Sequence, residues 1–373
     1  MQKKKIVFLT GTRADFGHIK GLISKLEQSK DFEPYVFVTG MHMLSKYGST
    51  VIEVTNQKYK NIHPYMNQTG NTDLDIILSN TILGFSNYIK EIQPDLVVIH
   101  GDRVEAFAGA TVGTFNNILT AHISGGEITG TIDEFMRHAI TKMSHIHFVA
   151  NDEAKKRLLR MGEKETSIYI IGSPEIDLML SNKLPLLSEV KKRYRIPFEK
   201  YAIFIFHPVT TELETLEYDI RVIVNALKTS DKNYVIIYPN NDPGSNIILD
   251  AIEKLRGLNN FKLLPSIRFE YFLTLLKNCQ CIIGNSSSGV REAPVYGVPT
   301  INIGTRQLNR SKAISIYDVN DTDDLILHNI DFLHNQRFEP FYEFGKGNSV
   351  ELFYKILQKK SFWETPIQKQ FVD

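Results

Sequence analysis

The chain has 373 residues, a formal net charge of +1, 42% hydrophobic residues and 23% charged residues. This composition is typical of a soluble globular protein, and the small net charge argues against a nucleic-acid-binding or anionic membrane surface. A chain of this length is too long for one ordinary core, so we expect two domains of similar size.

Neither a membrane span nor an export signal is expected. No apolar run approaches the roughly 18 residues that a membrane helix needs. Residues 1–5 lead directly into a strand-like run at 6–9, which is too short and too β-branched for a signal sequence. The two cysteines, Cys279 and Cys281, are not expected to pair. We therefore expect a reduced, cytoplasmic protein.

The first half of the chain alternates short apolar runs with amphipathic stretches. The apolar runs predict strands at residues 6–10, 35–39, 96–100, 119–123, 147–150 and 168–171. Helical patterns lie between them, for example at 19–26, 76–92 and 154–161. This alternation predicts βαβ units and a parallel sheet that is covered by helices on both faces.

The pattern restarts near Tyr201, after a polar, proline-marked connector around residues 173–185. Strands are predicted at 202–206, 234–238, 261–264, 281–283 and 300–303, each followed by a helical segment. We expect two doubly wound domains that face one another, with a ligand-binding cleft at the carboxyl ends of both sheets.

Polar residues follow three predicted strands of the first half. The turn at 11–17 places Arg13 at a helix start, where it suits an anion unless the turn only caps the helix. The run at 100–105 carries Asp102 and Arg103, which are either functional or a simple salt bridge. The run at 122–127 allows close backbone approach at its glycines, and Asp133 further on either faces the site or caps a helix.

The second half offers an anion site. His207, held at a strand end by Pro208, is expected to act as a phosphate donor or an acid–base group, with a structural histidine as the alternative. The small residues of 284–292 suit a strand–turn–helix junction whose N–H groups and serine hydroxyls close on phosphate oxygens. The helix is expected to open near Gly289, and the bland alternative is a serine N-cap. Glu292, one turn into that helix, suits a ribose diol, and Arg306 can reach the same anion.

We expect no metal and no cofactor. The sequence has no CxxC and no HExxH pattern, and its histidines are scattered. Its glycine-rich loops match neither GxxxxGK[ST] nor GxGxxG, which argues against an ATPase or a dehydrogenase.

As a set, these motifs resemble the hydrolysing UDP-N-acetylglucosamine 2-epimerases of sialic acid and legionaminic acid biosynthesis. The likeness runs from residue 5 to about 360 and rests on the motifs at 10–15, 100–103, 125–127, 130–133, 137–138, 207–211, 284–287 and 304–307. It implies a GT-B-like fold of two Rossmann-type domains, at residues 1–178 and 179–355. Residues 356–373 would form a helix end and tail that return to the first domain.

The resemblance also implies which residues form the site. Contacts with UDP fall on Arg13, His207, Asn240, Ser286, Ser287, Glu292 and Arg306, and contacts with the sugar fall on His42, Arg103, Asp102 and Asp133. The chain departs from the family at Ser124, where members often have Glu in a His-Ile-Glu-Gly-Gly-Glu run. Either Glu127 or a water held by Ser124 replaces the missing carboxylate, or the substrate is a different UDP-sugar.

The activity implied is release of N-acetylmannosamine and UDP, through loss of UDP to a glycal and hydration of that glycal. The diphosphate needs cations and N–H dipoles, and carbon 2 needs carboxylates as acid and base. Asp102 and Asp133 are the candidates, in either order. The alternatives are a diacetamido-trideoxy UDP-sugar as substrate, a GT-B glycosyltransferase and a catalytically silent UDP-sugar sensor. We expect a small-molecule UDP-sugar as ligand, no nucleic acid or membrane partner, and a homodimer or homotetramer.

Overall fold

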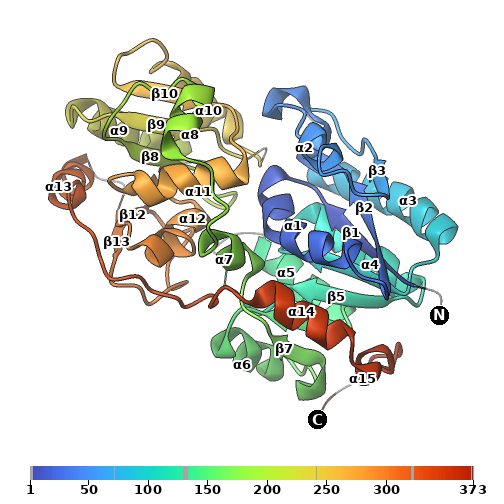
Figure 1. Ribbon diagram of the computed structural model, residues 1–373. Helices are drawn as coiled ribbons and strands as arrows, with labels where there is room; N and C mark the ends of the chain where they lie inside the picture. Colours follow the sequence, from blue (N-terminus) through green and yellow to red (C-terminus); the bar gives the residue numbers. More distant parts are fainter. Residues whose placement is uncertain are drawn as a thin grey trace. The chain divides into compact units, whose positions relative to one another are not determined.

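The computed structural model describes residues 3–70, 72–128, 133–240, 242–320, 323–370 and 372. The chain forms two compact units, each with its own parallel sheet (Figure 1). The first unit contains the described residues of Met1–Glu127, Asp133–Ser181 and Phe344–Asp373. The second contains those of Ile128–Ile132 and Asn182–Glu343. The predicted class, two α/β units with parallel sheets, is confirmed.

The first unit has a seven-stranded sheet in the order β3-β2-β1-β4-β5-β6-β7. Its strands are β1 (Lys4–Thr10), β2 (Phe32–Val38), β3 (Ile62–Pro64), β4 (Leu96–His100), β5 (Leu119–Ile123), β6 (Ile146–Val149) and β7 (Ile168–Ile170). All neighbouring strands pair in parallel. Six of the seven strands were predicted to within a few residues, and β3 was not.

Helices cover both faces of this sheet (Figure 1). They are α1 (Arg13–Glu27), α2 (Val51–Thr55), α3 (Leu74–Ile92), α4 (Val104–Phe115), α5 (Asp133–Met143), α6 (Asp152–Arg160), α7 (Pro174–Met179), α14 (Ser349–Leu357) and α15 (Lys360–Trp363), with short 3₁₀ turns at Gly40–Met43, Ser45–Tyr47 and Glu165–Ser167. Because successive side chains of a strand point to opposite faces, Ile6 and Phe8 join the core under α1 and α14. Val7 and Leu9 join the core under α3 and α4.

The C-terminal segment completes the first unit. In Figure 1 the red helix α14 lies beside the blue helix α1, although the sequence separates them by more than 300 residues. The ring centroid of Phe353 lies 6.5 Å from that of Phe8 and 4.9 Å from that of Phe148. The segment enters the unit where the N–H of Ser173 donates to the carbonyl of Phe344 at 2.6 Å. The last helices are therefore part of the core that the first strand builds.

The second unit has a six-stranded parallel sheet in the order β10-β9-β8-β11-β12-β13. Its strands are β8 (Ala202–Ile205), β9 (Tyr234–Ile237), β10 (Phe261–Leu264), β11 (Ile282–Gly284), β12 (Thr300–Ile303) and β13 (Ile316–Val319). Its helices are α8 (Leu187–Tyr194), α9 (Leu216–Thr229), α10 (Ser245–Glu253), α11 (Phe269–Asn278), α12 (Ser287–Val290) and α13 (Asp323–Leu333), with a 3₁₀ turn at Ala293–Tyr296. The helix expected near Gly289 begins at Ser287, and β13 was not predicted.

Both sheets reverse their strand order once. In the first unit the reversal falls between β1 and β4, and in the second between β8 and β11. Ligands of open α/β sheets bind outside the carboxyl ends of the strands at such a switch point. The motifs that follow β1, β4, β8 and β11 therefore stand where a ligand site is expected in each unit.

The two cysteines of the second unit do not form a disulfide. Cys279 and Cys281 are both free and buried, and burial raises the pKa of the Cys281 thiol to about 12. Among the described residues, no helix is both long enough and apolar enough to cross a membrane.

Candidate active site

The turn after β1 is tied together by Asp15. Thr12 is the N-cap of α1, and its hydroxyl accepts the Asp15 N–H at 3.2 Å in a capping box. The Asp15 carboxyl accepts the N–H groups of Gly11 and Thr12 at 2.9 and 3.2 Å and also the hydroxyl of Thr10. Burial raises the pKa of Asp15 to about 6. Thr12 therefore caps α1, and the anion contact expected at this turn stays a prediction.

Arg13 and His42 both have partners inside the first unit. The guanidinium of Arg13 lies 2.5 Å from the carboxylate of Glu53. The ring of His42 is fully buried, with Nδ1 at 2.7 Å from the Thr50 hydroxyl and Nε2 at 3.1 Å from the Thr10 hydroxyl. Burial, with the nearby Arg13 charge, lowers the pKa of His42 to about 3, so this ring is neutral. The predicted contacts of Arg13 with UDP and of His42 with the sugar stay predictions.

The carboxyl end of β4 carries two separate ion pairs. Asp102 pairs with Arg137 of α5, and Arg103 Nε lies 3.4 Å from Glu105 Oε2. Each of the two residues thus has a partner of its own, and the salt bridge considered between Asp102 and Arg103 stays a prediction. Arg137 Nη1 also donates to the carbonyl of Ser124 at 2.6 Å. Arg137, which is only 4% exposed, thus joins the end of β4 to the end of β5.

Glu105 is a buried carboxylate that sequence reasoning did not select. It is 1% exposed and lies against the backbone of the turn after β1. A Cβ added at Gly11 would come within 2.9 Å of the Glu105 Cδ, and one added at Gly40 within 2.6 Å of its Oε1. Only glycine at both positions leaves room for this side chain. As the second residue of α4, Glu105 had the sequence signature of an ordinary first-turn acid.

The turn after β5 begins at Ser124, whose backbone is left-handed with φ of 68°. Its hydroxyl lies 3.3 Å from His100 Nε2. The expected close backbone approach occurs at Gly126, where an added Cβ would lie 2.4 Å from the carbonyl oxygen of Ala154 in α6. Glu127 follows and is 6% exposed.

Asp133 is the first residue of α5, the helix that also carries Arg137. Residues 129–132, which hold the rest of the 130–133 motif, lie outside the described residues. The catalytic roles expected for Ser124, Glu127 and Asp133 stay predictions.

In the second unit, Asn285 organises the switch point. Its side chain accepts the His207 N–H at 2.7 Å and donates to the His207 carbonyl at 2.8 Å. Its own carbonyl accepts from Arg306 Nη1 at 3.2 Å and from Gln307 Nε2 at 3.1 Å. Asn285 thus connects the ends of β8, β11 and β12. Its place in the 284–287 motif was visible in the sequence, but its bonding role was not.

His207 has a defined tautomer when neutral. Its Nδ1 accepts the backbone N–H of Asn240 at 3.1 Å, so the proton of the neutral ring lies on Nε2. His207 and Arg306 are 7% and 8% exposed, so both are largely withdrawn from solvent. A donor nitrogen and a guanidinium joined through Asn285 suit an anion. The expected contacts of His207, Asn240 and Arg306 with UDP stay predictions.

The serine turn after β11 has the hydrogen bond of a helix cap. Ser286 Oγ accepts the Ser288 N–H at 3.3 Å, and Ser287 opens α12. Helix α12 ends at Val290, so Glu292 does not lie one turn inside it as expected. Glu292 instead precedes the 3₁₀ turn at Ala293–Tyr296 and is 2% exposed. The ligand contacts expected for Ser286, Ser287 and Glu292 stay predictions.

The chain is similar to known proteins over most of its length. The family model described as UDP-N-acetylglucosamine 2-epimerase matches residues 24–358. The chain belongs to this family. A relative named UDP-N-acetylglucosamine 2-epimerase, from Neisseria meningitidis serogroup B, is 45% identical over 377 residues, which is 99% of each chain. A relative named UDP-N,N'-diacetylbacillosamine 2-epimerase (hydrolyzing), from Legionella pneumophila, is 32% identical over 95% of this chain and 96% of its own length.

Solved structures of the family share the fold. A crystal structure of a UDP-GlcNAc 2-epimerase from Neisseria meningitidis, bound to UDP-GlcNAc, matches with a TM-score of 0.77. The match covers 95% of this chain and 99% of that one at 20% sequence identity, so it bears on the fold alone. The GT-B-like class expected from the sequence is confirmed by this likeness.

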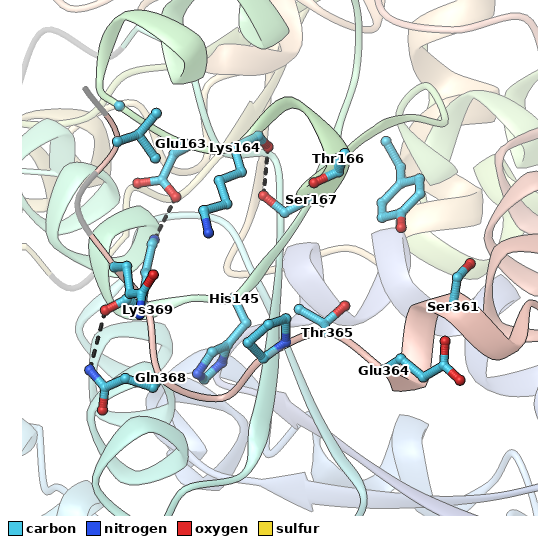
Figure 2. Close-up of a pocket in the computed structure, with 15 residues that line it drawn as sticks. His145, Glu163, Lys164, Thr166, Ser167, Ser361, Glu364, Thr365, Gln368 and Lys369 are labelled. Carbon is cyan, nitrogen blue, oxygen red and sulfur yellow. Dashed lines mark hydrogen bonds and ion pairs between the residues drawn. The ribbon is translucent and has the colours of Figure 1, made fainter.

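This family member also has a cavity of about 360 Å³ in its first unit, away from the motifs (Figure 2). The cavity is lined by residues next to the amino ends of β6 and β7, among them His145 and Lys164, and by the C-terminal segment at Ser361 and Lys369. Amino ends of parallel strands meet at the edge opposite their carboxyl ends. The cavity therefore lies outside the candidate active site.

An ion cluster around the buried Glu163, beside this cavity, fastens the C-terminal segment. Glu163 accepts from Lys369 at 2.5 Å and from Lys142 at 2.9 Å, and lies 2.9 Å from His147 Nε2. Burial alone would raise the pKa of Glu163, but the hydrogen bonds and charges of His147 and Lys369 outweigh it and hold the pKa at about 2. Lys369 also donates to the carbonyl of Ser144 at 2.8 Å. The cluster joins the tail to the end of α5.

Proposed function

We propose that the protein is a hydrolysing UDP-N-acetylglucosamine 2-epimerase, which converts UDP-N-acetylglucosamine and water into N-acetylmannosamine and UDP. The observation that carries the proposal is the group formed by Asp102, Arg137 and Ser124 at the switch point of the first unit. The names of the relatives from Neisseria meningitidis and Legionella pneumophila support the same reaction class.

The first unit supplies the acid–base chemistry in this proposal. A hydrogen on carbon 2 of the sugar is not acidic until departure of UDP builds positive character at carbon 1. A base must then take that hydrogen, and an acid must return one to the other face. The guanidinium of Arg137 favours the ionised form of Asp102, which suits a base. Asp133, on the same helix as Arg137, is the second candidate carboxylate.

The second unit supplies the site for the leaving group. His207 Nε2–H and the Arg306 guanidinium are joined through Asn285, and the N–H groups of the Ser286–Ser287 turn lie at the same switch point. Cationic groups and N–H dipoles stabilise the negative charge that grows on a departing diphosphate. Glu292 is the candidate acceptor for the ribose hydroxyls.

The second candidate substrate is a 2,4-diacetamido-trideoxy UDP-sugar, and the observation that favours it is Ser124. A serine occupies less space than the glutamate common in the family, and it leaves a less acidic surface at the end of β5. The Legionella relative, named for such a sugar, is 32% identical to this chain.

The test is proton NMR of UDP-N-acetylglucosamine incubated with the protein in heavy water. We expect UDP together with free N-acetylmannosamine that carries deuterium at carbon 2. Release of UDP with no deuterium in the sugar would show simple hydrolysis and overturn the elimination route. Turnover of the diacetamido sugar alone would favour the second candidate.

A further inference from the structure

Behind Ser124 the first unit contains a chain of titratable side chains that the proposed roles of the carboxylates do not use. His100 Nε2 lies 3.3 Å from Ser124 Oγ and 3.3 Å from His18 Nδ1. The two imidazole rings meet edge to face, with centroids 4.9 Å apart and an interplanar angle of 90°. His18 Nδ1 in turn lies 3.9 Å from Glu175 Oε2. Side chains from β4, α1, α7 and the turn after β5 thus form one line of polar contacts.

The interior position of this line matters for its charge. Glu175 is fully buried and Ser124 is 5% exposed, while the side chain of His18 is 15% exposed. A buried carboxylate favours the protonated form of an imidazole close to it. One added proton can be shared by the two histidines, because His18 Nδ1 and His100 Nε2 lie 3.3 Å apart and either nitrogen can donate to the other.

Arg137 connects this line to Asp102, the carboxylate assigned as the base. Arg137 donates to the carbonyl of Ser124 and pairs with Asp102. His100 and Asp102 are two residues apart at the end of β4, so both leave the sheet at one switch point. The arginine favours a charged carboxylate on one side, and Glu175, beside His18, favours one positive charge on the pair of His18 and His100 on the other. Opposite resting protonation of two neighbouring groups is what an acid–base pair requires.

We infer that His100 is the catalytic acid that protonates carbon 2, in place of a carboxylate at position 124, and that Ser124, His18 and Glu175 are its positioning residues. The inference rests on the proposed function and deepens it. A serine hydroxyl cannot itself deliver this proton near neutral pH, because it holds its proton too tightly. The neighbouring imidazole can deliver it.

In the elimination, the C–H bond at carbon 2 and the bond from carbon 1 to the UDP oxygen break. Asp102 takes the proton, and UDP leaves with the electron pair of the broken C–O bond. In the hydration, His100 gives its proton to carbon 2 as the double bond of the glycal opens, and a water oxygen bonds to carbon 1. The proton that this water loses returns to His100, and the proton on Asp102 passes to solvent.

The experiment separates these steps with UDP-N-acetylglucosamine in a single turnover. In the His100→Asn variant we expect UDP release to persist, the glycal to accumulate, and free sugar to form about 100-fold more slowly. Glu175→Gln, which acts through His18, should shift the balance toward glycal by about tenfold. Variants that slow UDP release and sugar release equally, with no glycal, would overturn the inference. Glu175→Gln keeps the test valid should His100→Asn fail to fold.

A rescue experiment distinguishes an acid from a structural part. Ser124→Glu, added to His100→Asn, places a carboxylate at the end of β5 and should restore sugar formation at least tenfold. Ser124→Gln in the same background is the matched control of equal size and should not. Recovery with both residues, or with neither, contradicts the inference. A wild-type protein that releases no UDP overturns the proposed function itself, whereas an active wild type with unaltered variants overturns the inference alone.

Discussion

The two units contain different kinds of buried charge. Among the described residues, the first buries four glutamates and four histidines, namely Glu105, Glu127, Glu163, Glu175, His42, His122, His145 and His147. The second buries one glutamate and one histidine, Glu292 and His207, together with the guanidinium groups of Arg291 and Arg306. Groups that exchange protons are concentrated in the first unit, which also buries Arg137, whereas the second unit buries two guanidinium groups and few groups that exchange protons. The difference indicates a division of labour between proton transfer and leaving-group binding, and it makes the stability of the first unit depend on its charges.

The largest effect is expected at the ion cluster of the first unit. Glu163→Gln removes the charge that faces the buried His147 and the partly exposed Lys142 and Lys369, and loss of these charge-assisted hydrogen bonds should cost about 3 kcal/mol. Urea unfolding followed by the fluorescence of Trp363, the only tryptophan in the chain, measures this loss within the first unit. Glu253→Gln in the second unit removes an exposed pair with Arg256 and should cost about 1 kcal/mol or less by circular dichroism. Equal losses in both variants would contradict the comparison.

The next effect concerns catalysis. Asp102→Asn keeps the shape of the side chain but cannot take a proton, so turnover should fall on the order of 100-fold or more. Asp133→Asn tests the second candidate in the same way. Affinity for UDP, measured by titration calorimetry, should stay within a factor of two or so in both variants. Unchanged turnover in either variant would assign that carboxylate to a structural role.

Binding of UDP should respond to the second unit instead. Arg306→Ala removes a charge-assisted hydrogen bond and should weaken UDP binding by about 1.5–3 kcal/mol. Ser287→Ala removes only a neutral hydroxyl, for which about 0.5–1.5 kcal/mol is expected. Calorimetric titration with UDP gives both values. Affinities equal to that of the wild type would remove the serine turn and Arg306 from the leaving-group site.

The smallest effect is a pH dependence of the first unit near neutrality. Burial lowers the pKa of both His42 and His122 to about 3, below the value of about 6.5 in an unfolded chain. The unfolded state therefore binds more protons, and stability falls as the pH drops through 6.5. Asp15 opposes this in part, because its raised pKa of about 6 adds stability as the pH falls from about 6 toward 4. From pH 7 to pH 6 we expect a net loss on the order of 1 kcal/mol. A Trp363 unfolding midpoint that rises over this range would refute it.

The fold was largely readable from hydrophobic runs. The buried strand β4 is a short apolar segment between Asp95 and Gly101, and β12 is a short buried segment between Pro299 and Gly304; both were predicted with their observed bounds. The missed strands β3 and β13 lie at sheet edges and are partly exposed, so they lack a continuous apolar run. The first residue of α12 was harder to predict, because it depends on the hydrogen bond that the Ser286 hydroxyl accepts from the Ser288 N–H.

The sequence indicated which segments lie at the two switch points, but not which of their side chains contact one another. Polar residues directly after predicted strands marked both switch points, since parallel strands share one carboxyl edge. Which side chains meet depends on three-dimensional packing. Arg137 is 35 residues from Asp102 along the chain, and no local pattern links them. The same holds for His18 and His100, which are 82 residues apart and meet because α1 packs beside the end of β4.

The path of the chain through the first unit has a consequence for synthesis. The second unit is formed almost entirely by one continuous stretch, Asn182–Glu343, and leaves the ribosome complete. The first unit still lacks Phe353, Ile356 and Phe362 at that moment, and these side chains cover Phe8 and Phe148. An apolar sheet face made at the start of translation must therefore wait for the final helices, as domains generally fold as units. A chain released before α14 would present that face to solvent and to chaperones.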